Sequence, residues 1–392
     1  MSLQLGAAPP SGGSGAPPGP RPPSKPRVRT ARRPRSFTQT DVFTLVGCAA
    51  SALALTWMTF TVLVGGGSWF GFLVVAYLVF LGLFALVTTD RLGRLVATDR
   101  VATVVIATFT VMLIVPLAWI IGYIVAKGLP GLTWRFFTSD QRGITPLRPA
   151  TAGGGAHAIV GTFEQVGIAL VLSVPIAIST AVFLNETRHR LRRPVRVVID
   201  AMSGLPSVLA GLFIYTAIII PYAKEGKFFG YNGLMAALAL SLVMVPTITR
   251  TVEVVLRLVP DGLREAGLAV GASRARVVWS VVLPTARTGL TTAVILGIAR
   301  AIGETAPLLF TTLGFSYMNA NPIDGPQESL PLFIYRNIRN PSTVTIQRGA
   351  TGALVLMMMV LSLFALARFI GRDRRPRGTR APRRSATPAR QS

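Results

Sequence analysis

Arg300 and Glu304 interrupt a long apolar run of this chain, and Arg250 stands at the end of another. Arg300 and Glu304 are four residues apart, so on one helix they share a face about 6 Å apart. An arginine at the centre of a membrane helix costs about 2.5 to 3.5 kcal/mol, and such a residue is expected to face a bundle interior or a water-filled cavity. Two arginines and one glutamate leave a net positive charge, and guanidinium groups bind oxyanions through paired hydrogen bonds. The three residues therefore predict a pathway for an anion.

Each of these charges also has a simpler explanation. Arg300 and Glu304 can form a buried ion pair whose only role is to fix the packing of helices. Arg250 lies close to the expected cytoplasmic end of an apolar run, so its charged group can reach the membrane surface while its stem stays in lipid. The anion pathway and these structural roles both remain open at this point.

The composition is that of a membrane protein. Of the 392 residues, 51% are hydrophobic and only 14% are charged, whereas about a quarter of the residues of a soluble domain are charged. The 40 Lys and Arg against 15 Asp and Glu give a net charge of +25. This excess lies in the two tails and between apolar runs, and a nucleic-acid-binding protein needs instead a basic face on a soluble module. We therefore expect no nucleic-acid partner.

Several other kinds of chemistry lack the residues that they need. Cys48 is the single cysteine, which excludes an intrachain disulfide. His157 and His189 are isolated from other possible ligands, so no metal site is expected. The loops hold no set of nucleophile, base and orienting group, and the chain has no phosphate-binding motif G-x-x-x-x-G-K-S/T. We expect a non-catalytic chain that binds no cofactor, with any ATP and Mg²⁺ used by a partner protein.

Eight apolar runs are long enough to span a membrane as helices. Seven of them carry no charge and the eighth is interrupted only by Arg300 and Glu304; they are residues 42–64, 69–87, 101–126, 165–184, 201–223, 228–249, 288–314 and 349–367. The predicted fold is an all-α polytopic membrane helix bundle. Basic residues are concentrated on the side of both termini and of the loop 188–196, which places both termini in the cytoplasm.

The two ends of the chain differ from the part between them. Residues 1–36 are rich in Pro, Gly, Ser and Arg, and residues 371–392 are rich in Arg. Both segments are predicted to be disordered, basic tails. Their charge suits contact with the surface of an anionic membrane lipid layer.

Residues 257–284 form the most patterned polar loop. Pro260 and Asp261 suit the start of a helix, Gly271 can end it in a left-handed conformation, and Ser273 can cap a second short helix that runs through Trp279. The first helix carries small residues on one face, which permits close docking by a soluble partner. An amphipathic helix that rests on lipid is the alternative, although such a helix should show large apolar and basic faces.

The spacing of this loop resembles the EAA loop of the permease subunits of bacterial ABC importers. The matching residues are Glu265, Ala266 and Gly267, then Gly271, and then Val281, Leu283 and Pro284. In that family the motif EAA-x3-G-x9-I-x-L-P forms coupling helices that sit in a cleft of the ATPase subunit. Gly267 in place of Ala and Val281 in place of Ile are changes that conserve size. The resemblance thus implies that Glu265, Ala266, Gly267, Gly271, Leu283 and Pro284 couple this chain to an ATPase.

Further segments are similar to one branch of that superfamily, the PstA permeases of phosphate-specific ABC importers. They are GGGAHAIVGT (153–162), FLNE (183–186), GLPSVLAGLF (204–213), PTITRTVEVVLRLVPDGLREAG (246–267) and ARAIGETAPLLFT (299–311). The resemblance covers about residues 101–370 and implies a six-span permease core there, with two extra spans in residues 37–100. Arg250 and Arg300 match family positions implicated in phosphate passage.

The resemblance also implies partners and a location. These are a PstC-like sister permease, a PstB-like ATPase dimer and an extracytoplasmic PstS-like phosphate-binding protein, assembled in the bacterial plasma membrane and working by alternating access. Three other functions are alternatives to this one. They are a permease for another oxyanion such as molybdate or sulfate, a membrane scaffold or sensor subunit that reports phosphate status without transport, and a secondary transporter, which gives no role to the coupling-type loop.

Overall fold

The computed structural model describes residues 39–62, 68–224 and 230–370, and the expected disordered tails 1–36 and 371–392 lie outside this part. In this part the regular secondary structure is helical, apart from one isolated bridge between Leu313 and Gln327, and loops join the helices. Seven of the described helices are long and apolar enough to cross a membrane, and a bent pair of helices can provide an eighth crossing. The predicted all-α membrane bundle is confirmed.

Contacts divide the chain into two compact units, Met1–Met112 and Leu113–Ser392. In the first, α1 (Gln39–Val62) and α2 (Trp69–Leu92) pack against each other and against the beginning of α3 (Arg94–Gly128). Their small core contains Cys48, Phe84 and Val104. Helix α2 ends at Gly93, whose φ of 84° lies in the left-handed region. Glycine suits this position because residues with a side chain rarely adopt such a conformation.

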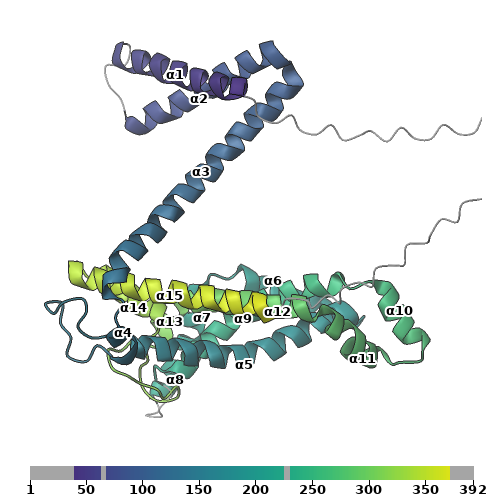
Figure 1. Cartoon of the computed structure of the whole chain (residues 1–392). Helices are drawn as coiled ribbons and strands as arrows, with labels where there is room; N and C mark the ends of the chain where they lie inside the picture. The colour runs from purple at the N-terminus through teal and green to yellow at the C-terminus, as the bar shows by residue number, and fades with distance from the viewer. Residues whose placement is uncertain (1–38, 63–67, 225–229, 371–392) are drawn as a thin grey trace, which may run out of the picture. The chain divides into compact units, whose positions relative to one another are not determined.

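The second unit contains the end of α3 and all later helices (Figure 1). In chain order these are α4 (Trp134–Thr138), α5 (Ala156–Glu186), α6 (Arg192–Gly204), α7 (Ser207–Ile214), α8 (Ile220–Lys224), α9 (Gly233–Arg257), α10 (Asp261–Ala269), α11 (Arg274–Val277), α12 (Leu283–Ile302), α13 (Ala306–Thr311), α14 (Leu330–Arg339) and α15 (Thr343–Ile370). A 3₁₀ turn (Leu129–Gly131) follows α3, and wide π-helical turns join α7 to α8 and α11 to α12.

Helix α9 forms the centre of this unit, since 67% of its most apolar window is buried. It runs parallel to α5: Ser241 bonds the carbonyl of Ala169, and Thr249 bonds that of Ala177 eight residues further along both helices. Buried alanines dominate the contact, and small residues let helix backbones approach closely in membranes. The α5–α9 pair is therefore the scaffold on which the functional residues stand.

Helix α12 crosses back along α9. A Cβ on Gly297 would lie 2.5 Å from Cγ1 of Ile248, and one on Gly289 would lie 2.4 Å from Cγ1 of Val255. The order of these contacts, 289 with 255 and 297 with 248, shows that the two helices are antiparallel. This arrangement brings the last turn of α12, with Arg300, next to the middle of α9.

Two of the expected spans are interrupted by proline. The run 201–223 bends by 104° between α6 and α7, because Pro206 excludes the helical conformation at Leu205, which is extended at ψ of 132°. The run 288–314 ends as a helix at Ile302 and resumes at α13, where Pro307 has no N–H to donate to a carbonyl four residues earlier. Each expected continuous span is thus two helices with a break.

Candidate functional site

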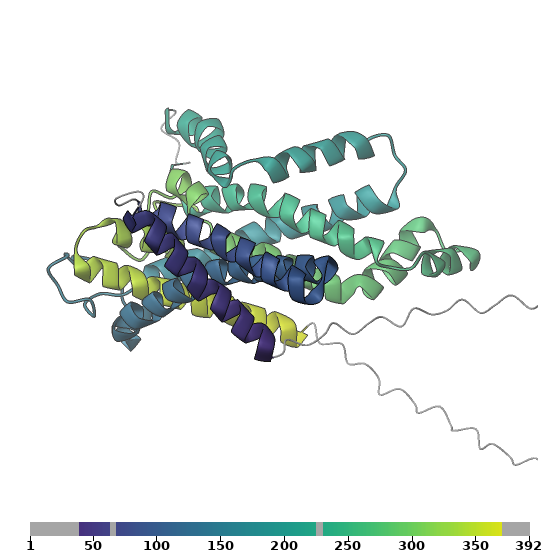
Figure 2. The same ribbon diagram turned by 90° about the horizontal axis from the view of Figure 1, so that it is seen from above.

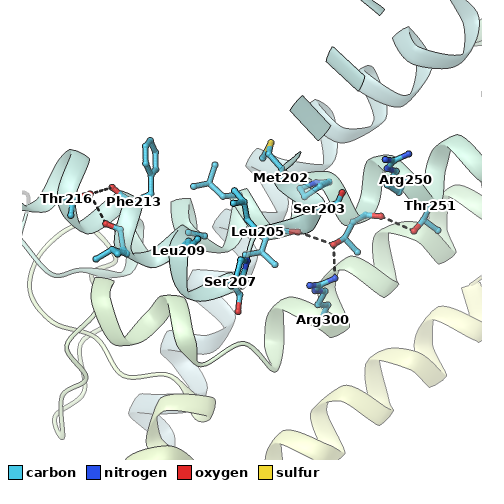
Figure 3. A pocket seen from close by; sticks show the side chains of 17 residues that line it. Met202, Ser203, Leu205, Ser207, Leu209, Phe213, Thr216, Arg250, Thr251 and Arg300 are labelled. Atoms are coloured by element: carbon cyan, nitrogen blue, oxygen red, sulfur yellow. Dashed lines mark hydrogen bonds between the residues drawn. The ribbon is translucent and has the colours of Figure 1, made fainter. Parts of the chain in front are cut away.

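A cavity of about 770 Å³ lies between α6, α7, α9 and the end of α12. Arg250 and Arg300 both line it, although they are fifty residues apart in the sequence. Figure 3 shows the two arginines at one end of the cavity, with Phe213 and Thr216 at the other end. The lining also carries the hydroxyl groups of Ser203, Ser207, Thr247 and Thr251.

The break between α6 and α7 shapes this cavity. Met202, Leu205, Pro206 and Leu209 belong to its lining, so the turn forced by Pro206 forms one wall. The opposite wall comes from α9, where Pro246, Thr247 and Arg250 follow one another along the helix. Most of the cavity's lining is apolar. Among the described residues, the guanidinium groups of Arg250 and Arg300 are the only charged groups that line it.

Arg300 lies in the last turn of α12, and its side chain is 54% exposed. Its Nη1 lies 3.4 Å from the hydroxyl of Thr247, and its Nε lies 3.6 Å from Oε1 of Glu304. Glu304 comes after the helix has ended and does not line the cavity. The two residues thus form the expected pair, but across the break after α12 and not on one continuous helix face.

Arg250 is paired with carboxylates that the sequence alone did not single out. It forms an ion pair with Asp200 of α6, and its Nη1 lies 3.8 Å from Oε2 of Glu253. Both members of the Arg250–Asp200 pair are about half exposed. The charge of Arg250 is therefore partly neutralised while its side chain stays accessible from the cavity.

Glu253 is the centre of a charge cluster next to the cavity. Its side chain is only 4% exposed, and its Oε1 lies 2.5 Å from Nη2 of Arg196 and 3.4 Å from Nη2 of Arg257. The spacing to Arg250 (three residues) and to Arg257 (four residues) is a local signal that could have identified Glu253. The contact from Arg196, on α6, could not have been found in this way.

The loop resembling the EAA motif has the local structure that its sequence predicts. Helix α10 begins after Pro260, Gly271 has φ of 84°, and the hydroxyl of Ser273 accepts a hydrogen bond from the backbone N–H of Arg276. The second helix differs from the expectation: α11 does not stop at Trp279 but continues through a π-helical turn into α12. The loop is therefore continuous with the helix that carries Arg300.

Figures 1 and 2 both show α10 and α11 projecting from one end of the second unit. Glu265, Ala266, Gly271 and Pro284 are exposed there, while Gly267 and Leu283 are half-buried. A Cβ on Gly267 would lie 2.9 Å from Cγ2 of Val277, so glycine at this position lets α10 and α11 pack closely. The predicted coupling residues thus comprise four that a partner can reach and two that hold the loop together.

Arg264 attaches α10 to the ends of two long helices. Its guanidinium group lies 3.0 Å from Oε1 of Glu186 at the end of α5. It also donates to the carbonyls of Leu256 (2.8 Å), in the last turn of α9, and of Val259 (2.6 Å), just after α9. Both charged side chains are mostly buried. The loop is therefore rigidly connected to the α5–α9 scaffold.

Comparison with known proteins gives the family. Residues 173–376 match the family described as binding-protein-dependent transport system inner membrane component. The phosphate transport system permease protein PstA 1 of Mycobacterium tuberculosis (strain ATCC 25618 / H37Rv) is 36% identical over 283 residues, which cover 71% of this chain and 89% of that protein.

Relatives from more distant organisms give the same result. PstA of Yersinia pestis is 36% identical over 257 residues, covering 65% of this chain and 83% of that protein. The probable PstA of Methanocaldococcus jannaschii is 30% identical over 278 residues, covering 70% of this chain and 94% of that protein. With this identity across most of each relative's length, the chain belongs to the PstA family of phosphate transport system permease proteins.

Proposed function

We propose that this chain is one of two non-identical permease subunits of an ATP-driven importer of inorganic phosphate. The observation that carries the proposal is the cavity in which Arg250 and Arg300 meet. Guanidinium groups present paired N–H donors that match a phosphate oxyanion. The names of the relatives, all phosphate transport permeases, favour phosphate over sulfate or molybdate.

The two arginines offer weak sites, as a transport pathway needs. Asp200 competes with an anion for Arg250, and Glu304 competes for Arg300. An ion must bind well enough to enter a pathway and weakly enough to leave it, so partly neutralised arginines suit passage better than bare ones. The hydroxyl of Thr247, 3.4 Å from Arg300, is a further hydrogen-bonding group for an anion held there.

The driving force comes from a partner in this proposal. A PstB-like ATPase dimer docks on α10 and α11 and uses ATP and Mg²⁺, while this chain is non-catalytic and binds neither. Glu265, Ala266, Gly267, Gly271, Leu283 and Pro284 are the coupling residues. The continuity of α11 with α12 and the Arg264–Glu186 ion pair carry the movement into the bundle, which opens to each side in turn.

The remaining partners follow from the same proposal. A PstC-like sister permease completes the pathway, and an extracytoplasmic PstS-like protein delivers phosphate. Both termini lie in the cytoplasm in this proposal. Residues 37–100 form two additional spans, and residues 101–370 form the six-span permease core with its coupling loop 257–284.

Radiolabelled phosphate uptake tests the proposal. The chain and its three partners are expressed in phosphate-starved cells that lack their own importer, and Arg300→Gln is compared with wild type at matched membrane abundance. We expect uptake to be lost in Arg300→Gln and kept in Arg287→Gln, which removes an exposed arginine of the same helix outside the cavity.

Three results would contradict the proposal in different ways. Full uptake by Arg300→Gln would reduce the Arg300–Glu304 pair to a structural role. Uptake of sulfate or molybdate in place of phosphate would change the substrate. Absence of any oxyanion uptake by the assembled wild-type complex would favour a sensor or scaffold.

A further inference from the structure

A second, smaller cavity lies at the end of the bundle opposite α10 and α11. Its volume is about 170 Å³, and it lies between the segment 141–146, helix α14 and the first turns of α15. Figure 1 shows α14 at the end of the second unit opposite α10 and α11. Helix α5 begins at this end and reaches Arg264 of α10 with its last residue, Glu186. The lining is mainly polar and includes Gln141, Glu328, Arg336, Asn340, Thr345 and Arg348.

Arg348 is a buried cation without a carboxylate partner in the described part of the chain. Its exposed fraction is 4%, and its two terminal nitrogens donate to the carbonyls of Thr145 (3.3 Å), Arg148 (2.8 Å) and Pro149 (3.0 Å). Its Nε is buried and has no hydrogen-bond partner. Buried charges in proteins are normally paired, because an uncompensated one costs several kcal/mol. The cavity beside Arg348 is where a counter-charge is missing.

The other two charges that line the cavity cancel each other. The distance between Nη1 of Arg336 and Oε2 of Glu328 is 2.7 Å, and the side chain of Glu328 is 3% exposed. Arg336 itself is 44% exposed, so one side of its guanidinium group stays accessible. The lining therefore keeps one net positive charge, from Arg348, together with the amide groups of Gln141 and Asn340 and the hydroxyl of Thr345.

We propose that this cavity binds one small inorganic oxyanion. A volume of about 170 Å³ admits a tetrahedral ion with a few waters, each of which occupies about 30 Å³ in the liquid, and it excludes a nucleotide or a sugar. The anion supplies the charge that Arg348 lacks and accepts hydrogen bonds from Arg336 and the neutral donors. That this ion is the transported phosphate rests on the proposed function.

The position of the cavity makes it a binding site that a transported anion would reach before the larger cavity. The backbone N–H of Leu330, two residues after Glu328, donates to the hydroxyl of Thr162 on α5. Thr249, beside Arg250 of the larger cavity, bonds the carbonyl of Ala177 on the same helix. At 1.5 Å per residue the two levels are roughly 20 to 30 Å apart. An anion that reaches this end of the bundle would thus be held there before it enters the larger cavity.

Phosphate binding to the purified, nucleotide-free complex in nanodiscs tests the proposal. The binding protein is left out because it binds phosphate itself, and the larger cavity is silenced with Arg250→Gln and Arg300→Gln. Burial raises the pKa of Glu328 to about 7, so binding of radiolabelled phosphate is measured at pH 8, where this carboxyl is ionised. Sulfate is used as a second probe.

We expect one saturable site to remain in this background. Arg336→Gln should weaken it about tenfold or more, since hydrogen bonds to charged groups contribute about 1.5 to 3 kcal/mol. Glu328→Gln should tighten it, because the carboxylate no longer competes for Arg336. Arg339→Gln, which removes an exposed arginine of α14 outside the cavity, should leave it unchanged.

The opposite effects of Arg336→Gln and Glu328→Gln separate a binding site from a structural ion pair. Loss of a pair that only stabilises the fold would act in the same direction in both variants, and that result would overturn the proposal, as would absence of any saturable site for either probe. Arg348→Gln is a third variant, and its phosphate binding is compared with the others only if the complex still assembles. Binding of sulfate but not phosphate would support the anion site and count against phosphate as the transported ion.

Discussion

Asp200→Asn should make the larger cavity hold its anion more tightly. Asp200 forms an ion pair with Arg250, so an anion that binds Arg250 has to displace or share this carboxylate. Asparagine keeps the size of the side chain and removes the charge. The rest of the Arg250 environment, including Glu253 at 3.8 Å, stays in place.

The size of the effect follows from the exposure of the pair. The side chains of Arg250 and Asp200 are 44% and 46% exposed, so water screens their attraction. Ion pairs of this kind contribute about 0.2 to 1 kcal/mol, which corresponds to a factor of about 1.4 to 5 in affinity. A much larger gain is not expected, because Glu253 continues to neutralise part of the charge of Arg250.

Binding of radiolabelled phosphate to the complex in nanodiscs measures this change. The Arg336→Gln background lowers the contribution of the smaller cavity, whose affinity is expected to fall about tenfold or more. Asp90→Asn, which alters an exposed aspartate elsewhere, serves as control. Unchanged or weaker binding by Asp200→Asn would refute the reasoning. It would mean that Asp200 orients Arg250 for the anion and does not compete with it.

Three further predictions concern stability and coupling. Gly161→Ala places a Cβ 2.0 Å from the carbonyl oxygen of Glu328 and should lower the free energy of unfolding by about 1 to 3 kcal/mol. Gly167→Ala, on the same helix, meets no atom within 4 Å and should leave the free energy of unfolding unchanged. Thermal unfolding in detergent compares the two variants. Burial raises the pKa of Glu328 from 4.5 to about 7, so the folded state keeps a proton that the unfolded state has lost, and stability should fall by about 1.4 kcal/mol per pH unit across this window. Glu328→Gln should flatten that dependence in the same assay, and a wild-type curve that rises between pH 4.5 and 7 would have the wrong sign. Arg264→Gln should lower the phosphate transported per ATP hydrolysed in proteoliposomes severalfold, because α10 loses its contact with Glu186; an unchanged ratio would exclude this route of coupling.

The sequence predicted the features that depend on neighbouring residues. The length and apolar character of the runs identified the spans, and the turn between α10 and α11 followed from the cap at Ser273 and the left-handed Gly271. Proline effects are local as well, yet the breaks at Pro206 and Pro307 were not predicted from hydropathy. Hydropathy averages over a window and does not register one missing N–H donor or one extended residue.

Features that depend on distant residues were out of reach. Asp200 meets Arg250 because the chain reverses between α5 and α6, so that α6 runs antiparallel to α9, with Arg196 beside Glu253 and Asp200 beside Arg250. Arg348 is 199 to 203 residues away in the sequence from the three residues whose carbonyls accept its hydrogen bonds. In the sequence it is one more basic residue outside the membrane. Charged residues in apolar runs indicate an anion pathway from the sequence alone. Their ion-pair partners, which decide how strongly each residue binds an anion, are set by the packing of helices that are distant in the sequence.

Those partners distinguish the two anion sites. Arg250 and Arg300 are each about half exposed and each face a carboxylate, so an anion between them exchanges readily with Asp200 or Glu304. Arg348 is buried and has only carbonyl oxygens for partners among the described residues, so an anion beside it replaces no carboxylate. A tighter site at the end that receives phosphate and a weaker one in the larger cavity would oppose spontaneous inward movement, because the ion would move from stronger to weaker binding. Such a difference in affinity slows that step, and α11, continuous with α12 and its Arg300, is the element through which an ATPase docked on the loop would weaken the hold on the anion.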